Sequence, residues 1–259
     1  MRASRKPASL RRFFARPVVS QLAIVILAVL AWEVAARYST DELFTSPPSA
    51  VFAAAADLFD EAGVMHAVLT TLWELGLSFL LAVGFGLAIG VGVGASGTSY
   101  RSLYPIILLA YAIPQVTVLP LFVLYFGPGP ASKVAFGFSH GIFPIIVNVV
   151  AGLRTVPAGL LRSAYSMGAN KQQIFRRITF PHLVPSFFTG MRLGMTATLL
   201  GVLLSELYVS SGGIGYYTEL YTESFEPQNL FALTGMLALM AVFLNEVVRR
   251  AEIRHSRWR

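Results

Sequence analysis

Long apolar segments alternate with shorter polar segments along the 259 residues of the chain. A helix needs about 20 mostly apolar residues to cross the hydrocarbon layer of a membrane, which is about 30 Å thick. The pattern therefore predicts six transmembrane helices, at about 18–37, 66–94, 103–126, 133–153, 183–207 and 229–248. A tail at 1–17, a polar loop at 154–182 and a tail at 249–259 complete the chain. The expected fold is an all-α membrane protein with a transmembrane domain at 18–248.

Glycines recur at four-residue spacing in two of these segments. Gly86, Gly90 and Gly94 end the second span, and Gly190 and Gly194 lie in the fifth. Small residues at this spacing let two helix backbones approach closely in lipid. We interpret both sets as helix-packing positions and not as sites of chemistry.

The composition supports a membrane location. Hydrophobic residues make up 55% of the chain and charged residues 13%, whereas soluble domains carry about 25% charged residues. A soluble domain of this length would need more polar surface than these residues supply. The absence of cysteine excludes disulfides, cysteine-based zinc sites and thiol nucleophiles.

The net charge of +7 is an orientation signal. Lysine and arginine gather in both tails and in the loop at 154–182, while the loops at 38–65 and 208–228 have none. Basic loops stay in the cytoplasm, so both termini and the 154–182 loop are predicted to be cytoplasmic. Nucleic acid is therefore not an expected partner. A cleaved signal peptide is an alternative for the first span, but its removal would leave five spans and an external N-terminus.

The loop at 154–182 is long for a connection between membrane helices. Within it, apolar and small residues fall at helical spacing, which predicts an amphipathic helix outside the membrane: Leu160, Leu161, Ala164, Met167 and Gly168. A second helical stretch is expected from Lys171 to Ile178, stopped by Pro181. The spacing alone leaves two interpretations open, a helix resting on lipid headgroups and a docking element for a cytoplasmic partner.

The same loop carries a motif. Residues 163–169 read Ser-Ala-Tyr-Ser-Met-Gly-Ala and residues 178–181 read Ile-Thr-Phe-Pro, which resembles the EAA motif of binding-protein-dependent ABC importer permeases. The sequence departs from that motif at Arg162, Ser163 and Phe180, where Glu, Ala and Leu are usual. The resemblance implies contact with a separate ATPase through Ser163, Ala164, Met167, Gly168, Ala169, Ile178 and Pro181.

Other short segments from about Trp32 to the C-terminus are similar to the nitrate, sulfonate, taurine and bicarbonate subgroup of these permeases. They include Thr45 to Val51, Ala112-Ile113-Pro114, Ala151-Gly152-Leu153-Arg154, Thr189 to Leu193, Glu206 and Gly213-Ile214-Gly215-Tyr216. The sequence departs from the subgroup at Glu74, where arginine is frequent.

The resemblance implies a type I ABC importer permease in the bacterial inner membrane. Its expected partners are membrane lipid, a second permease copy, cytoplasmic ATPase subunits that hold ATP and Mg, and a periplasmic or lipid-anchored solute-binding protein. The expected solute is a small anion such as a sulfonate, nitrate, taurine or bicarbonate.

Prolines and polar residues interrupt the third and fourth spans. A proline within a span frees a backbone carbonyl, which is tolerated where neighbouring helices or water satisfy it. The residues alone leave a packing kink and a pathway-lining role equally open, and the resemblance favours the pathway. The candidate pathway residues here are Pro114, Gln115, Thr117, Pro120 and Asn148.

Two charged residues lie on the fifth span. Arg192 and Glu206 are about 21 Å apart along one helix at 1.5 Å per residue, so they cannot pair with each other. Arg192 fits either a structural role, with its side chain extended to the interface, or the pathway. Glu206, near the outer end, fits either contact with water or gating. Glu33 and Glu74 are interpreted as interfacial residues with a structural role.

Other functional classes lack support in the sequence. An ion-coupled secondary transporter, the main alternative, usually shows internal repeats and charged sites near the midplane. An intramembrane enzyme needs a nucleophile–base pair or a metal cluster, and the histidines stand apart from other ligand types. The glycine-rich segment 211–215 has neither the preceding strand nor the Gly-Lys-Ser/Thr of a phosphate-binding loop, so we expect an outer loop or gate. No catalytic, metal or cofactor site is expected in this chain.

Overall fold

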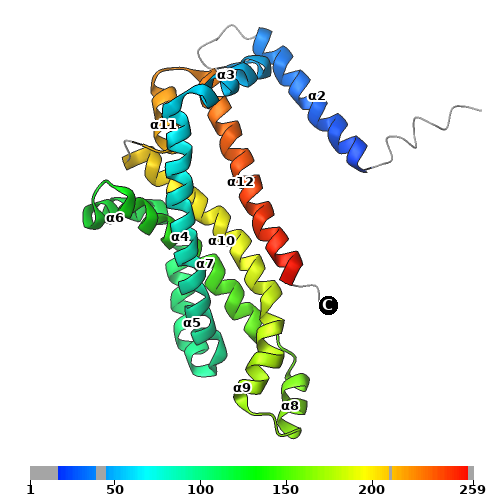
Figure 1. Ribbon diagram of the computed structural model, residues 1–259. Coiled ribbons are helices and arrows are strands. Elements are labelled where there is room, and N and C mark those ends of the chain that lie inside the picture. The colour runs from blue at the N-terminus through cyan, green and yellow to red at the C-terminus, as the bar shows by residue number, and fades with distance from the viewer. Residues whose placement is uncertain (1–16, 39–44, 210–211, 256–259) are drawn as a thin grey trace, which may run out of the picture.

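The computed structural model describes residues 17–38, 45–209 and 212–255, and every regular element within these ranges is a helix (Figure 1). Most of the predicted N-terminal tail lies outside the described residues. In chain order the elements are α2 (Pro17–Tyr38), α3 (Pro48–Asp60), α4 (Ala62–Ala95), α5 (Gly97–Ala112), η1 (Gln115–Val118), α6 (Leu119–Phe126), α7 (Pro130–Arg154), α8 (Ala158–Ser166), α9 (Lys171–Ile174), η2 (Phe175–Thr179), α10 (Phe180–Val209), α11 (Ile214–Glu223) and α12 (Pro227–His255).

Five helical stretches of the described residues are long and apolar enough to cross a membrane. They cover 20–38, 63–95, 130–154, 171–209 and 227–254. The pair formed by α5 and by η1 with α6 meets the same test together, although it is bent by 84°. Counting that pair as one span, the described residues hold up to six, the number that the sequence predicts. The orientation of the termini stays a prediction.

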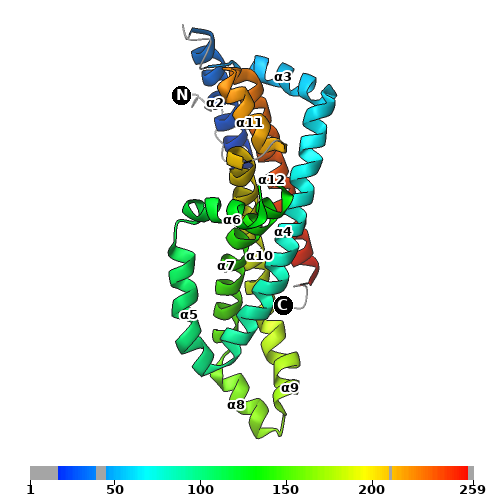
Figure 2. The same ribbon diagram turned by 90° about the vertical axis from the view of Figure 1, so that its left-hand side faces the viewer.

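The long helices run side by side, with short helices at both ends of the bundle (Figure 1, Figure 2). We name the ends by these short helices: α8 and α9 mark the α8–α9 end, and α3 and α11 mark the α3–α11 end. Helix α2 contacts α3, its Trp32 ring lies 5.6 Å from the Phe231 ring of α12, and it projects away from the bundle in Figure 1. The side-chain carboxylate of Glu33 on α2 accepts hydrogen bonds from the Ser49 amide at 3.0 Å and the Arg37 guanidinium at 2.6 Å.

Helix α7 is the centre of the packing, because α4 covers one of its faces and α10 another. The glycines Gly86 and Gly90 of α4 face Ile145 and Val149 of α7. A Cβ atom on Gly86 would lie 2.8 Å from Ile145, and one on Gly90 would lie 2.6 Å from Val149. No ordinary side chain fits at such distances, so the predicted close approach at these glycines is confirmed.

The glycines of the fifth span have the same role where α10 packs against α7. A Cβ atom on Gly190 would lie 2.9 Å from Asn148, and one on Gly194 would lie 2.8 Å from Ile145. Gly94 likewise meets Leu153, at 2.7 Å. Both glycine sets therefore pack against the same central helix.

The third predicted span is not one continuous helix. Helix α5 begins at Gly97, earlier than predicted, and ends at Ala112, where Ile113 is extended with φ −66° and ψ 130°. A proline disfavours the helical conformation of the residue before it, so Pro114 accounts for the break. Pro120 starts a helix instead of breaking one, because it lies in the first turn of α6, where a missing N–H costs nothing.

The prediction that Pro181 stops a helix is wrong. The helical stretch continues from Lys171 to Val209, through the π-helical turn η2 and into α10. Pro181 falls directly after η2, in the first turn of α10. A π turn widens the helix locally, which lets the chain accommodate a residue that lacks the N–H and would crowd the preceding turn.

Candidate functional site

The predicted coupling motif forms a protruding helical hairpin at the α8–α9 end. Helix α8 closes on Gly168, whose φ of +79° favours glycine. The Gly168 amide donates to the Tyr165 carbonyl and the Ala169 amide to the Ala164 carbonyl, both at 3.0 Å. This pair of bonds is the Schellman arrangement that ends a helix. The short helix predicted here from spacing is confirmed.

The turn leads into α9, whose first residues are also stabilised by local hydrogen bonds. The Asn170 side chain accepts from the Gln173 amide, and the Gln173 side chain accepts from the Asn170 amide, both at 2.9 Å. These reciprocal bonds form a capping box for α9. The hairpin therefore depends mainly on contacts between residues close in sequence.

The surface of the hairpin is partly apolar and uncovered. Leu160 is 53% exposed and Met167 is 86% exposed. The motif positions Ser163, Ala164, Met167, Gly168 and Ala169 gather on α8 and its turn, while Ile178 and Pro181 lie on η2 and α10. Exposed apolar side chains on a protruding element can be buried by a partner protein.

The candidate pathway residues of the third span lie at the bend between α5 and α6. The hydroxyl of Thr117 donates to the Pro114 carbonyl at 2.7 Å, so this carbonyl is satisfied within the turn. Gln115 reaches α7, where its side-chain oxygen accepts from Ser139 at 3.4 Å.

Beside this bend is an open groove of about 480 Å³. Pro120 is one of its lining residues, and Tyr208 and Val209 line it from the end of α10. The bend thus brings the third span together with the end of the fifth, which sequence spacing does not predict.

The structure does not gather the remaining pathway candidates into this groove. Asn148 is half-buried on α7, and its amide donates to the Pro144 carbonyl at 2.8 Å. Arg192 forms an ion pair of 3.5 Å with Glu252 of α12. Their assignment to the pathway stays a prediction, and the ion pair gives Arg192 a structural partner that the sequence does not reveal.

Glu206 does not reach water at the end of its helix, which was one of its two expected roles. Its side chain is fully buried, and it accepts from the Thr71 hydroxyl at 2.7 Å and from the Gly215 amide at 2.9 Å. The Thr71 hydroxyl oxygen in turn accepts from the Ile214 amide at 2.9 Å. Glu206 therefore joins α10 to α4 and to the start of α11.

A buried ion pair lies on neighbouring elements at the same end. The Lys133 ammonium of α7 is 2.9 Å from a carboxylate oxygen of Glu74 on α4, and it donates to the Gly212 carbonyl at 3.3 Å. Both side chains are nearly inaccessible to solvent. The ion pair gives Glu74 the structural role expected of it and places its side chain inside the α4–α7 contact, while its depth in the membrane stays a prediction. The only feature of the sequence that could have indicated this ion pair was the single charged residue within each of several apolar segments.

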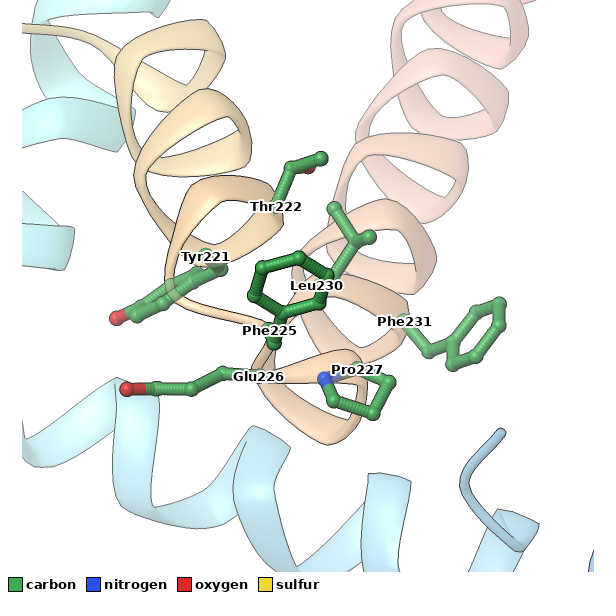
Figure 3. A pocket seen from close by; sticks show the side chains of 7 residues that line it. All are labelled: Tyr221, Thr222, Phe225, Glu226, Pro227, Leu230 and Phe231. Carbon is green, nitrogen blue, oxygen red and sulfur yellow. The ribbon is translucent and has the colours of Figure 1, made fainter. Parts of the chain in front are cut away.

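A small pocket of about 170 Å³ lies at the turn between α11 and α12 (Figure 3). Tyr221, Phe225 and Leu230 are among its lining residues. Burial, reinforced by the nearby Glu61 carboxylate, raises the pKa of Tyr221 to about 12. The Tyr221 hydroxyl is therefore protonated at neutral pH and donates to Glu61 at 3.4 Å. Phe225 has φ +54°, an unusual value for a side chain of this size.

Within the described ranges, no group of three or more histidine, aspartate or glutamate side chains could hold a metal ion. The arrangement consists instead of a protruding hairpin, a bent helix pair beside a groove, and a buried polar cluster at the opposite end. These features define a multi-pass helical membrane protein.

Residues 82–251, more than half of the chain, match the family described as binding-protein-dependent transport system inner membrane component. The chain belongs to this family. It is a multi-pass inner-membrane permease of a binding-protein-dependent ABC transporter and is not itself an enzyme. Such a system implies a separate ATPase and a solute-binding protein as partners.

Several characterised permeases are similar to this chain over most of its length. The formylaminopyrimidine transport permease protein ThiX of Halalkalibacterium halodurans is 26% identical over 90% of this chain and 93% of its own length. The taurine transport system permease protein TauC of Escherichia coli is 29% identical over 91% of this chain and 87% of its own. The nitrate import permease protein NrtB of Synechocystis is 28% identical over 71% of this chain and 70% of its own.

Proposed function

We propose that two copies of this chain form the translocation pathway for a small anion, such as a sulfonate, nitrate, taurine or bicarbonate. A periplasmic or lipid-anchored binding protein delivers the solute at the α3–α11 end. Cytoplasmic ATPase subunits drive transport through the α8–α9 hairpin. The observation that carries the proposal is the uncovered apolar surface of that hairpin in a chain of this family.

Charge supports the proposed orientation. Lys171 lies in the hairpin and Arg176 and Arg177 follow it, and basic segments are retained in the cytoplasm. The α3 and α11 elements carry acidic residues instead, among them Asp57, Asp60, Glu219 and Glu223.

The open groove supports a pathway made by more than one copy. In a single chain the groove beside Pro120 and Tyr208 is open on one side, whereas a regulated pathway must be enclosed. A second copy facing the same groove would close it, and a closed two-fold arrangement is the commonest form of oligomer.

The solute class is inferred from the relatives. The names of TauC and NrtB specify taurine and nitrate, while that of ThiX specifies a formylaminopyrimidine. Uptake into proteoliposomes containing the complete transporter should be competed by sulfonates or nitrate and not by a neutral pyrimidine. Competition by the pyrimidine alone would reject the anion and leave the coupling proposal intact.

The coupling proposal is tested at Gly168. No heavy atom lies within 4 Å of a Cβ placed on this residue, so a substitution acts through the backbone and not through a clash. Gly168→Val strains a left-handed position, at a cost of about 1–2 kcal/mol or more, and should lower ATP-driven uptake by at least about tenfold. ATP hydrolysis should persist without transport.

Gly168→Asn is the matched control, because asparagine tolerates the left-handed region. It should keep most of the uptake. Normal uptake with Gly168→Val, or equal losses with both variants, would contradict a coupling role for this turn.

A further inference from the structure

The start of α11 is held by side chains from other helices. The first N–H groups of a helix have no partner within the helix, and a side chain at the preceding residue usually accepts from them. Gly213 stands at that position in α11 and has no side chain to do so. The Ile214 amide donates to Thr71 of α4, and the Gly215 amide donates to Glu206 of α10.

Glycines make this close approach possible. Gly213 has φ +100°, which favours glycine, and a Cβ atom on it would collide with the Glu206 carboxylate. A Cβ atom on Gly215 would lie 2.8 Å from the Leu203 carbonyl oxygen and 2.9 Å from the Leu207 amide. The backbone of the segment 212–215 therefore sits directly against the end of α10.

The ion pair also holds the same segment. Lys133 contacts Glu74 and also donates to the Gly212 carbonyl. Among the described residues, the Glu74 carboxylate has no polar partner besides the Lys133 ammonium, so it depends on that ammonium for compensation. Four elements, α4, α7, α10 and α11, thus meet at one buried polar cluster.

Such a cluster favours one position of α11. Removing one partner of a buried charged group leaves the other uncompensated, at a cost of several kcal/mol. A displacement of the 212–215 segment separates Gly215 from Glu206 and Gly212 from Lys133 together. Apolar packing alone would tolerate small shifts of α11 at a lower cost, because hydrophobic contacts are not directional.

The held segment is next to the groove. Tyr208 and Val209 line the groove beside the α5–α6 bend, and they follow Glu206, which accepts from the Gly215 amide, in the same helix α10. The position of the segment 212–215 is therefore coupled to the wall of the groove at the α3–α11 end.

We propose that Thr71, Glu74, Lys133 and Glu206 are positioning residues for transport, forming a latch that holds the segment 212–215 and fixes the wall of the groove formed by Tyr208 and Val209. Transport requires this latch to shift when the solute-loaded binding protein arrives. The inference rests on the proposed pathway beside the α5–α6 bend.

The test uses Thr71→Val, which keeps the shape of the side chain and removes the hydroxyl that links Glu206 to Ile214. In the complete transporter, we expect ATP hydrolysis without binding protein to rise severalfold. Stimulation by the loaded binding protein should fall by a similar factor. Thr71→Ser, which retains the hydroxyl, should restore both values to those of the unmodified protein.

Thr198→Val is the matched control for losing a buried threonine hydroxyl. Thr198 is buried on α10, and its hydroxyl has no hydrogen-bond partner among the described residues. A latch predicts that Thr198→Val behaves like the unmodified protein. Equal changes in the Thr71→Val and Thr198→Val variants would reduce the role of Thr71 to general packing and overturn the proposal.

Gly215→Ala provides an independent variant, because it displaces α11 by crowding Leu203 and Glu206 instead of removing a hydrogen bond. The position of α11 can be followed directly, since the chain contains no cysteine. The thiol introduced by Tyr216→Cys should react severalfold faster with a membrane-impermeant maleimide in combination with Thr71→Val or Gly215→Ala than in the Tyr216→Cys variant alone.

The outcomes separate the latch from the coupling proposal. Unchanged labelling and unchanged stimulation in both Thr71→Val and Gly215→Ala would overturn the latch. If Gly168→Val still abolished uptake, the role of the hairpin would stand without it.

Discussion

The two ends of the molecule solve the problem of helix termini in opposite ways. At the α8–α9 end, Gly168 and the pair Asn170 and Gln173 satisfy the backbone groups locally. At the α3–α11 end, Thr71 and Glu206 satisfy the start of α11 from two other helices. A locally stabilised hairpin keeps its shape when it moves, whereas a helix held from elsewhere is sensitive to displacement of its neighbours.

The ends also differ in what they bury. The hairpin leaves Leu160 and Met167 exposed, while Glu74 and Glu206 are fully buried at the opposite end. Apolar groups in water and charged groups in the interior are both unfavourable unless something compensates them. For the buried charges the partner is within the chain, and for the exposed apolar groups we infer a partner outside it.

The largest expected effect is at the buried ion pair. Lys133→Ala leaves the Glu74 carboxylate without its counter-charge, which should destabilise the protein by about 3–5 kcal/mol. Thermal unfolding in detergent would measure this. The double variant Lys133→Met with Glu74→Met should recover most of the loss, because it removes both charges. A double variant as unstable as Lys133→Ala would argue against the ion pair as the cause.

A smaller effect is expected at the hairpin. Asn170→Ala removes the side chain that caps α9, at a cost of about 1 kcal/mol. Because the cap is local, hydrogen exchange should increase in α9 and remain unchanged in α7, and coupled uptake should fall less than with Gly168→Val. Faster exchange throughout the bundle would show that the hairpin is not a locally stabilised unit.

The smallest effect is expected at the turn between α11 and α12. Phe225 adopts the left-handed conformation that Gly168 adopts at the other end, and asparagine tolerates that conformation better than phenylalanine. Phe225→Asn should change the free energy of unfolding by no more than about 1 kcal/mol, because relief of strain offsets lost packing in the pocket. Uptake should be unaffected. A loss of uptake would give this turn a role in transport.

Local signals made the helical content and the hairpin predictable. Apolar segments of sufficient length marked the spans, and the spacing around Gly168 marked the helix and its turn. The glycines from Gly86 to Gly94 correctly indicated a tight contact, although not that α7 is the helix they meet. These features depend on residues near one another in sequence, which is the information that periodicity carries.

Features that depend on distant residues were not predictable. The ion pair between Glu74 and Lys133 joins two spans, and neither residue alone indicates a partner. The 84° bend follows in position from Pro114, but its angle depends on how α5 and α6 pack. The continuation of the helix past Pro181 depends on a π turn. No residue preference in the sequence predicts the hydrogen bonds of such a turn.

The uninterrupted helical stretch from Lys171 to Val209 has a mechanical consequence. Helix α10 alone is 30 residues long, or about 45 Å at 1.5 Å per residue, and it joins the hairpin at one end of the bundle to Glu206 near the other. If the hairpin receives the ATPase as proposed, a force on it would be transmitted along this helix, and the π turn η2 interrupts the regular α-helical hydrogen bonding near the hairpin. A lever of this kind converts a small tilt at its base into a lateral shift of several ångströms at its tip.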